Sequence, residues 1–100
     1  MSRRGVDFIL ELEGITEDDL TEPMCTEMQE YFNKLDFPIK QVGVLENNNL
    51  CIEGQIVHLT KKDVDAKYRA FKADLKIILN KYKLKYKLND HRLIYFDKLY

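Results

Sequence analysis

The stretch from Thr60 to Tyr82, TKKDVDAKYRAFKADLKIILNKY, is the clearest structural element in the sequence. Its apolar residues recur at i, i+4 and i+7 over roughly five turns, so on a helix they form one stripe. Thr60 is expected to cap this helix, and Asp63 lies in its acidic first turn. The apolar stripe consists of Val64, Tyr68, Phe71, Leu75, Ile78, Leu79 and Tyr82.

The residues before this helix predict a strand followed by another helix. Residues 6–12, VDFILEL, place every second side chain on one apolar face, which is typical of a strand. Apolar residues return to helical spacing over about residues 22–35, where a helix is expected. Thr21 is a plausible N-cap, Pro23 fits the first turn, and Pro38 prevents the helix from continuing.

Two apolar-rich runs then predict a β-hairpin. Val42–Glu46 and Leu50–Val57 are joined through Asn47, Asn48 and Asn49, and asparagine tolerates the positive φ that tight turns require. Gly54 inside the second run suggests a bulge.

The end of the chain alternates once more and predicts a second hairpin. Leu84, Tyr86 and Leu88 alternate with Lys83, Lys85 and Lys87, Asn89-Asp90 can form a two-residue turn, and residues 91–97 return as the partner strand. This pairing places Leu93 and Tyr95 on the core face and Arg92, Ile94 and Phe96 beside the three lysines. The predicted order is β-α-β-β-α-β-β, an α+β fold with a single antiparallel sheet and two helices on one face.

Length and composition indicate one folded domain over residues 1–100. The chain has 45% hydrophobic and 33% charged residues, which argues against disorder. No stretch approaches the roughly 20 apolar residues of a membrane-spanning helix, and acidic residues interrupt the N-terminal apolar run, so neither a membrane span nor a signal peptide is expected. Cys25 and Cys51 are too few for a disulfide scaffold, and the cytosol is the expected compartment.

The net charge of −1 conceals a strong segregation of charge along the chain. Residues 1–60 carry 4 Lys or Arg and 12 Asp or Glu, a balance of −8, whereas residues 61–100 carry 12 and 5, a balance of +7. One interpretation is a bipolar fold whose halves attract each other. The other is a basic surface that binds a polyanion.

Motifs for catalysis are absent. The sequence contains no phosphate-binding glycine loop, zinc-protease motif, Cys-x-x-Cys or nucleophile elbow, so neither an enzyme nor a cofactor is expected. Cys25, Cys51, His58 and His91 are not spaced as metal-ligand pairs, and both thiols are expected to be ordinary packed side chains. The acidic run at residues 17–19 is interpreted as a solvated turn.

The basic residues of the long helix favour polyanion binding. Lys62, Arg69, Lys72, Lys76 and Lys83 fall on a stripe beside the apolar one, and Asp63 and Asp74 project elsewhere. Clustered cations bind phosphates through counterion release. Tyr82, Tyr86 and Phe96 could stack on unpaired bases, although the two tyrosines sit in apolar registers typical of core residues. A protein-interaction module that docks an acidic partner through the same face is the alternative.

Short similarities to a known family run through residues 6–97. Phe8–Glu11, the acidic turn and the Met24–Leu35 helix are similar to an opening strand, a "VEDG" connection and a "FEQFL"-like helix. Val57–Lys62 is similar to a "VPFSKR" entry into the second helix, and Leu93–Phe96 to a closing "LRYF". The sequence thus resembles the eukaryote-specific large-subunit ribosomal protein twenty-two family. It departs from that family in a loop shortened to about Asp36–Gln41, a missing acidic tail and the lack of tryptophan.

The resemblance implies a structural constituent of the cytosolic large ribosomal subunit. Its partners would be ribosomal RNA and neighbouring large-subunit ribosomal proteins, with no membrane, cofactor, metal or small-molecule substrate. Lys61 and Lys62 correspond to the family's basic pair at the start of the second helix, and the other candidates rest on helical geometry as well. The candidate RNA-binding residues are Lys61, Lys62, Arg69, Lys72, Lys76, Lys83, Lys85 and Lys87.

Overall fold

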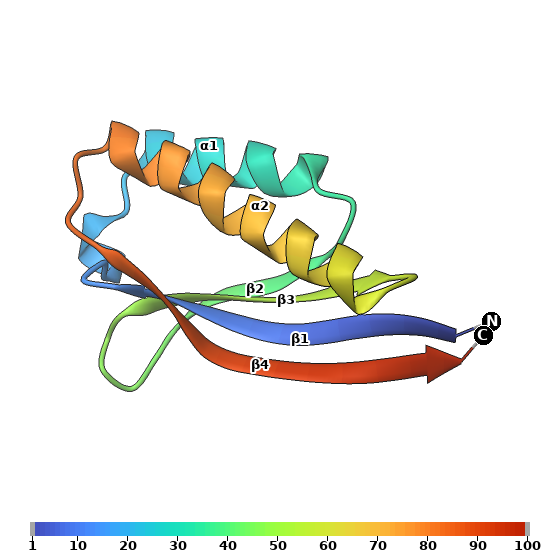
Figure 1. Ribbon diagram of the computed structural model, residues 1–100. Coiled ribbons are helices and arrows are strands. Elements are labelled where there is room, and N and C mark those ends of the chain that lie inside the picture. The colour runs from blue at the N-terminus through green and yellow to red at the C-terminus, as the bar shows by residue number, and fades with distance from the viewer. Residues whose placement is uncertain (1, 100) are drawn as a thin grey trace.

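The apolar stripe of the long helix packs on a sheet whose strands come from both halves of the chain. The computed structural model describes residues 2–99, and its main elements follow the order β-α-β-β-α-β (Figure 1). They are β1 (Ser2–Glu13), α1 (Glu22–Lys34), β2 (Ile39–Val44), β3 (Leu50–His58), α2 (Lys61–Lys81) and β4 (Lys87–Leu99), with a short 3₁₀ turn over Glu17–Asp19.

The four strands form one antiparallel sheet in the order β2-β3-β1-β4. Both helices lie on the same face of this sheet, and the other face carries no helix (Figure 1). The predicted class, α+β with a single antiparallel sheet and two helices on one face, is confirmed. The topology is the split β-α-β arrangement of ferredoxin-like domains, in which the first strand becomes a central one.

The predicted closing hairpin is wrong, and so is the seventh element of the predicted order. Residues 87–99 form one 13-residue strand, β4, which pairs along the length of β1. Residues 83–86 are not a strand but the connection that descends from the helix layer to the sheet (Figure 1). The 12-residue β1 offers a whole edge of backbone donors and acceptors on this side, and a single long strand pairs more of them than a short hairpin would.

The predicted turn at Asn89-Asp90 lies inside β4 because distant side chains bind both residues. The Asn89 amide donates to Glu11 Oε1 at 3.0 Å, and Asp90 Oδ1 accepts the hydroxyl of Tyr68 at 2.6 Å. The chain accommodates the turn-like sequence with a bulge at His91, where the register with β1 shifts.

Side-chain alternation along β4 follows the prediction. Tyr95 and Leu93 stand opposite Val6 and Phe8, on the face that the helices cover. Arg92, Ile94 and Phe96 stand opposite Ile9, Asp7 and Gly5, on the uncovered face. Lys83 and Lys85 are no longer strand neighbours of these residues, since both lie in the connection.

Phe71 occupies the centre of the core and is 1% exposed. Its ring centroid lies 5.6–6.3 Å from those of four aromatic residues of the first half, Phe8, Tyr31, Phe32 and Phe37. The predicted stripe of α2 is confirmed, because six of its members are buried and Tyr82 is partly buried.

The caps follow the prediction, and a hairpin forms where it was expected, although its first strand runs over Ile39–Val44 and leaves Leu45 and Glu46 in the loop. Thr21 Oγ1 accepts the amide of Met24 at 3.4 Å, and Thr60 Oγ1 accepts that of Asp63 at 3.1 Å. The β2–β3 loop contains Asn48 at a φ of 70°.

The irregularity expected at Gly54 lies on its partner strand, between Ile39 and Gln41 of β2. Gly54 serves a different purpose: a Cβ there would lie 2.6 Å from Cζ of Phe8. The missing side chain thus makes room for a core ring.

Glu11 connects three segments on the uncovered side of the sheet. Its carboxylate accepts the amides of Asn47 at 2.8 Å and Asn49 at 3.1 Å, from the β2–β3 loop, in addition to that of Asn89 in β4. These hydrogen bonds, chiefly those of Asn47 and Asn89, lower the pKa of Glu11 to about 2. The ionised carboxylate therefore holds the β2–β3 loop and the start of β4 onto β1.

Candidate nucleic-acid interface

The helix α2 presents two charged flanks, one on either side of its buried stripe. On the flank facing α1, Lys67 pairs with Asp36 and Lys81 pairs with Glu27. The Tyr31 hydroxyl donates to Asp74 on the same flank at 3.0 Å. The lysines beside Asp36 and Glu27 lower the pKa values of both carboxyl groups. This flank, which we call the paired flank, uses its cations to bind the acidic half of the chain.

The opposite flank holds the predicted RNA-binding residues of α2 and lies on the side of β4. Lys62, Arg69 and Lys76 are spaced by seven residues, so they form a line about 21 Å long at 1.5 Å per residue. All three side chains are exposed, and none forms a salt bridge within residues 2–99. Arg69 helps to lower the pKa of Asp65, but that carboxylate is hydrogen-bonded to Lys61 and Tyr95. The line therefore carries net positive charge.

The line continues into the connection between α2 and β4. Lys76 and Asn80 of α2 share an open hollow of about 650 Å³ with Lys85 and Lys87. Lys83, in the left-handed region at a φ of 56°, is exposed at the start of the connection. We call the set that forms no salt bridge within residues 2–99 the basic surface; it consists of Lys62, Arg69, Lys76, Lys83, Lys85 and Lys87.

Lys61 is brought to this flank but is largely compensated. Its Nζ lies 2.9 Å from Asp65 and 4.6 Å from the ring centre of Tyr95, whose hydroxyl also donates to Asp65 at 2.7 Å. The hydrogen bond with Asp65 raises the pKa of Lys61, and the reciprocal contact lowers that of Asp65. The predicted site does not include Asp65, although its helical position between Lys61 and Arg69 indicates that it lies beside both.

Lys72 is compensated by a residue from another element. Its Nζ lies 3.3 Å from Asp90 of β4 and 4.5 Å above the ring of Tyr68, and its side chain is only 27% exposed. The sequence pattern predicts a turn at Asp90, and therefore gives no sign of this pair. The structure thus places Lys61 and Lys72 beside the basic surface, each with a carboxylate partner.

The aromatic residues considered for base stacking are engaged elsewhere. The hydroxyl of Tyr82 donates to Glu27 at 2.8 Å, and that of Tyr86 donates to Asn80 at 2.7 Å. Both rings pack against the core. Phe96 lies on the uncovered face, where its ring covers Gly5. These positions favour the core interpretation of the tyrosines over stacking on bases.

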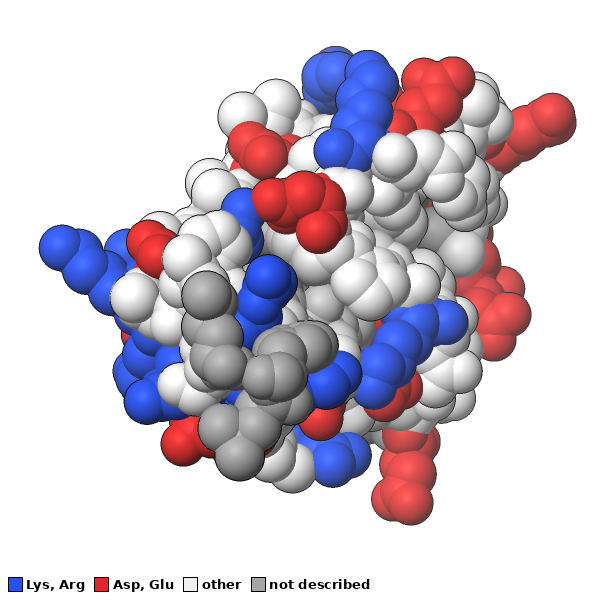
Figure 2. Space-filling view, turned by 90° about the vertical axis from the view of Figure 1, so that its right-hand side faces the viewer, with Lys and Arg blue, Asp and Glu red and all other residues white. Residues whose placement is uncertain are grey.

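Charge is unevenly spread over the face in Figure 2: Asp and Glu predominate along its right-hand edge, and Lys and Arg are frequent at its left and lower parts. Lys and Arg also gather at the top, and acidic residues lie among the basic ones elsewhere on this face. The segregation of charge along the sequence is therefore only partly reproduced on this face.

The remaining candidate groups form no further centre within residues 2–99. No set of three or more His, Cys, Asp and Glu side chains is placed to hold a metal ion there. His58 Nδ1 contacts Asp63 at 3.1 Å, Cys51 is buried and Cys25 is exposed. No helix in this part of the chain combines the length and apolarity needed to cross a membrane.

Comparison with known proteins gave no match: no protein-family model, curated protein or solved structure is significantly similar to the chain. The residues and their geometry are therefore the basis for a functional assignment.

Proposed function

We propose that the protein binds structured RNA through the basic surface. The observation that carries the proposal is the contrast within α2: Lys67 and Lys81 form salt bridges with acidic residues, whereas Lys62, Arg69 and Lys76 form none within residues 2–99. A line of exposed cations without salt-bridge partners attracts a polyanion, since each phosphate that it neutralises releases a condensed counterion. The lysine-lined hollow at the end of α2 extends the contact toward β4.

The resemblance to the large-subunit ribosomal protein twenty-two family supplies a setting for this RNA. In that setting the protein is a structural constituent of the cytosolic large subunit, binds ribosomal RNA and contacts neighbouring ribosomal proteins. Its role is to hold RNA in place, with no reaction and no cofactor.

The test is RNA binding by two variants of equal charge. In one, Lys62, Arg69 and Lys76 are replaced by Gln; in the other, Lys34, Lys67 and Lys81 are replaced by Gln. Both lose three positive charges, but only the first loses them from the basic surface. We expect the first variant to lose most of its affinity for a structured RNA and the plot of log K against log salt to flatten by about two to three units. The second should bind nearly as the parent does.

Equal weakening of both variants would contradict a localised site and indicate diffuse attraction. Affinity for an acidic protein that survives high salt, together with weak RNA binding, would favour the alternative function, a non-ribosomal protein-interaction module. Sedimentation of the native protein away from large ribosomal subunits would contradict the ribosomal setting while leaving RNA binding intact.

A further inference from the structure

The edge of the sheet farthest from β4 is formed by β2, whose only partner strand within residues 2–99 is β3. Leu50 of β3 donates its amide to Ile15 at 2.8 Å, so its backbone faces away from β2. Val44 stands opposite Leu50, and in an antiparallel pair hydrogen-bonded and non-hydrogen-bonded positions alternate. The backbone N–H and C=O groups of Val44, and those of Val42 two residues before it, therefore point outward from the sheet.

This edge is also apolar on the side that the helices cover. Val42 is 45% exposed and Val44 is 43% exposed, although both stand opposite buried residues of β3. Between α1 and β2 lies a hollow of about 300 Å³, lined in part by Phe32, Phe37 and Val42. An additional strand can form hydrogen bonds with backbone groups that point outward from a sheet edge, and it can pack against exposed β-branched side chains there.

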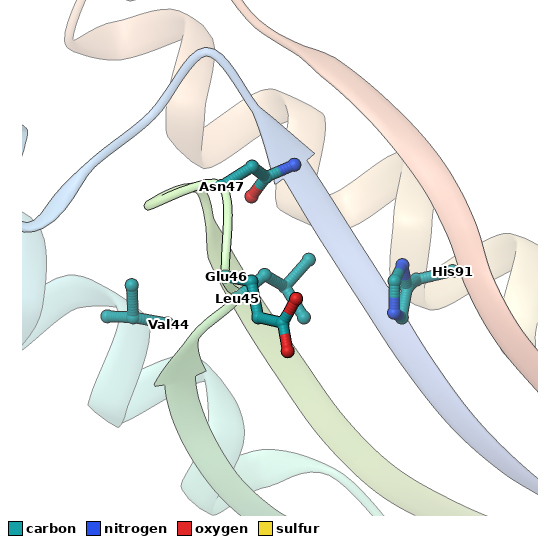
Figure 3. Close-up of a pocket in the computed structure, with 5 residues that line it drawn as sticks. All are labelled: Val44, Leu45, Glu46, Asn47 and His91. Carbon is teal, nitrogen blue, oxygen red and sulfur yellow. The ribbon is translucent and has the colours of Figure 1, made fainter.

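Carboxylates flank the Val44 end of the edge. One hollow there, of about 400 Å³, is lined by Thr16, Glu17, Asp18, Val44 and Asn48. A second, of about 650 Å³, is lined by Val44, Leu45, Glu46, Asn47 and His91 (Figure 3). In Figure 3 the first four of these come from the end of β2 and the loop after it, and His91 comes from β4, with β1 running between them.

The carboxylates near Val44 have no charged or hydrogen-bonding partner within residues 2–99. The side chains of Glu17, Asp18 and Glu46 form no salt bridge or hydrogen bond within residues 2–99. Successive side chains of an added strand point to opposite sides of the sheet, so a strand next to Val44 can approach Glu46 on one side and Glu17 and Asp18 on the other. Charge complementarity therefore selects a basic strand.

We propose that the outer edge of β2, with Glu17, Asp18 and Glu46, binds a basic extended segment of a partner protein by strand addition. The partner segment supplies backbone groups for Val42 and Val44, apolar side chains for the exposed valines and Lys or Arg for the carboxylates. The site is separate from the basic surface and does not depend on RNA binding.

The probe is the peptide acetyl-(Val-Lys)4-amide, followed by amide hydrogen exchange and NMR chemical shifts of the full chain. We expect slower exchange at the amides of Val42 and Val44, with no change at Gly43, which already faces β3. The control peptide acetyl-(Pro-Lys)4-amide has the same charge, but its four prolines lack a backbone N–H and disfavour pairing as a regular strand. If it perturbs the same amides equally, or if the valine peptide leaves them unchanged, the proposal is overturned.

Two substitutions test the contacts separately. Val44→Pro removes an outward amide and leaves the β2–β3 ladder intact, so it should abolish the protection. Glu46→Lys should weaken peptide binding several-fold, whereas Glu30→Lys, the same charge change on the exposed face of α1, should have little effect. Equal effects of the two lysine variants would overturn the charge argument. If the parent chain dimerises and Val44→Pro abolishes the dimer, a second copy is the occupant of the edge and the proposal is overturned.

Discussion

The two flanks of α2 differ in their surroundings as well as in their number of cations. Lys67 and Lys81 of the paired flank meet Asp36 and Glu27, so the acidic half of the chain neutralises them. Lys62, Arg69 and Lys76 of the basic surface lie on the side of β4, where the acidic half does not reach them. The position of a cation around the helix therefore decides whether an acidic residue of the same chain pairs with it or whether it stays available to a partner molecule. One interpretation of the sequence is that the acidic half of the chain attracts the basic half. That interpretation describes the paired flank.

The largest effect is expected at the stripe that separates the two flanks. Phe71→Ala should lower the free energy of unfolding by about 3–5 kcal/mol, because it removes a fully buried ring and leaves a cavity among four aromatic residues. Chemical denaturation of parent and variant measures this difference. A loss below about 1 kcal/mol would mean that the ring is not in the core and that the assignment of both flanks is wrong.

A smaller effect is expected where Glu11 holds the β2–β3 loop and the start of β4. Glu11→Gln should cost about 1–3 kcal/mol at pH 7, since an amide replaces a charged acceptor shared by three asparagines. The pKa of Glu11 is about 2 in the folded protein and 4.5 ordinarily, so its contribution is complete above pH 4.5 and is lost as the pH falls toward 2.

The difference in unfolding midpoint between parent and Glu11→Gln should therefore shrink between pH 4.5 and pH 2. Glu46→Gln, at an exposed carboxylate without a partner, is the control and should show no such convergence. A difference that stays constant with pH would contradict the role given to the ionised carboxylate.

A still smaller effect should come from freeing Lys72 at the margin of the basic surface. Asp90→Asn keeps an acceptor for the Tyr68 hydroxyl and removes the charge that compensates Lys72. We expect RNA affinity to rise several-fold and the salt slope to steepen by somewhat less than one unit. Unchanged affinity in a filter-binding titration would place Lys72 outside the RNA contact.

The smallest effect is expected on the paired flank. Lys67→Gln combined with Lys81→Gln removes two exposed salt bridges, and such pairs contribute at most about 1 kcal/mol each and often far less. The unfolding free energy should therefore change by less than about 2 kcal/mol for the two pairs together. A loss above about 2 kcal/mol would show that attraction between the halves is a principal source of stability.

Local patterns in the sequence predicted the parts of the structure that depend on neighbouring residues. The α2 stripe, the caps at Thr21 and Thr60, and the alternation of β4 all follow from spacing along one element. The failures involve distant residues. Asn89-Asp90 resembles a turn until Glu11 and Tyr68 supply partners from 78 and 22 positions away.

In the candidate site, too, the sequence predicted the local arrangement but not the contacts between distant residues. Helical geometry placed Lys62, Arg69 and Lys76 on one line, but it gave no means of knowing that Lys72 meets Asp90 across the fold. Asp65 is different, because its interaction with Lys61 is local and its helical position was available in the sequence.

The central position of β1 has a consequence for how the chain folds. Its first residues pair with the last ones of β4, as in Ser2 with Leu99, so this contact spans almost the whole chain. Contacts of such sequence separation slow folding, because a long loop must close before they form. During synthesis β1 emerges first, and its edge toward β4 stays open until the final strand has been made. A chain interrupted before β4 would therefore expose a long apolar strand edge and be prone to aggregation.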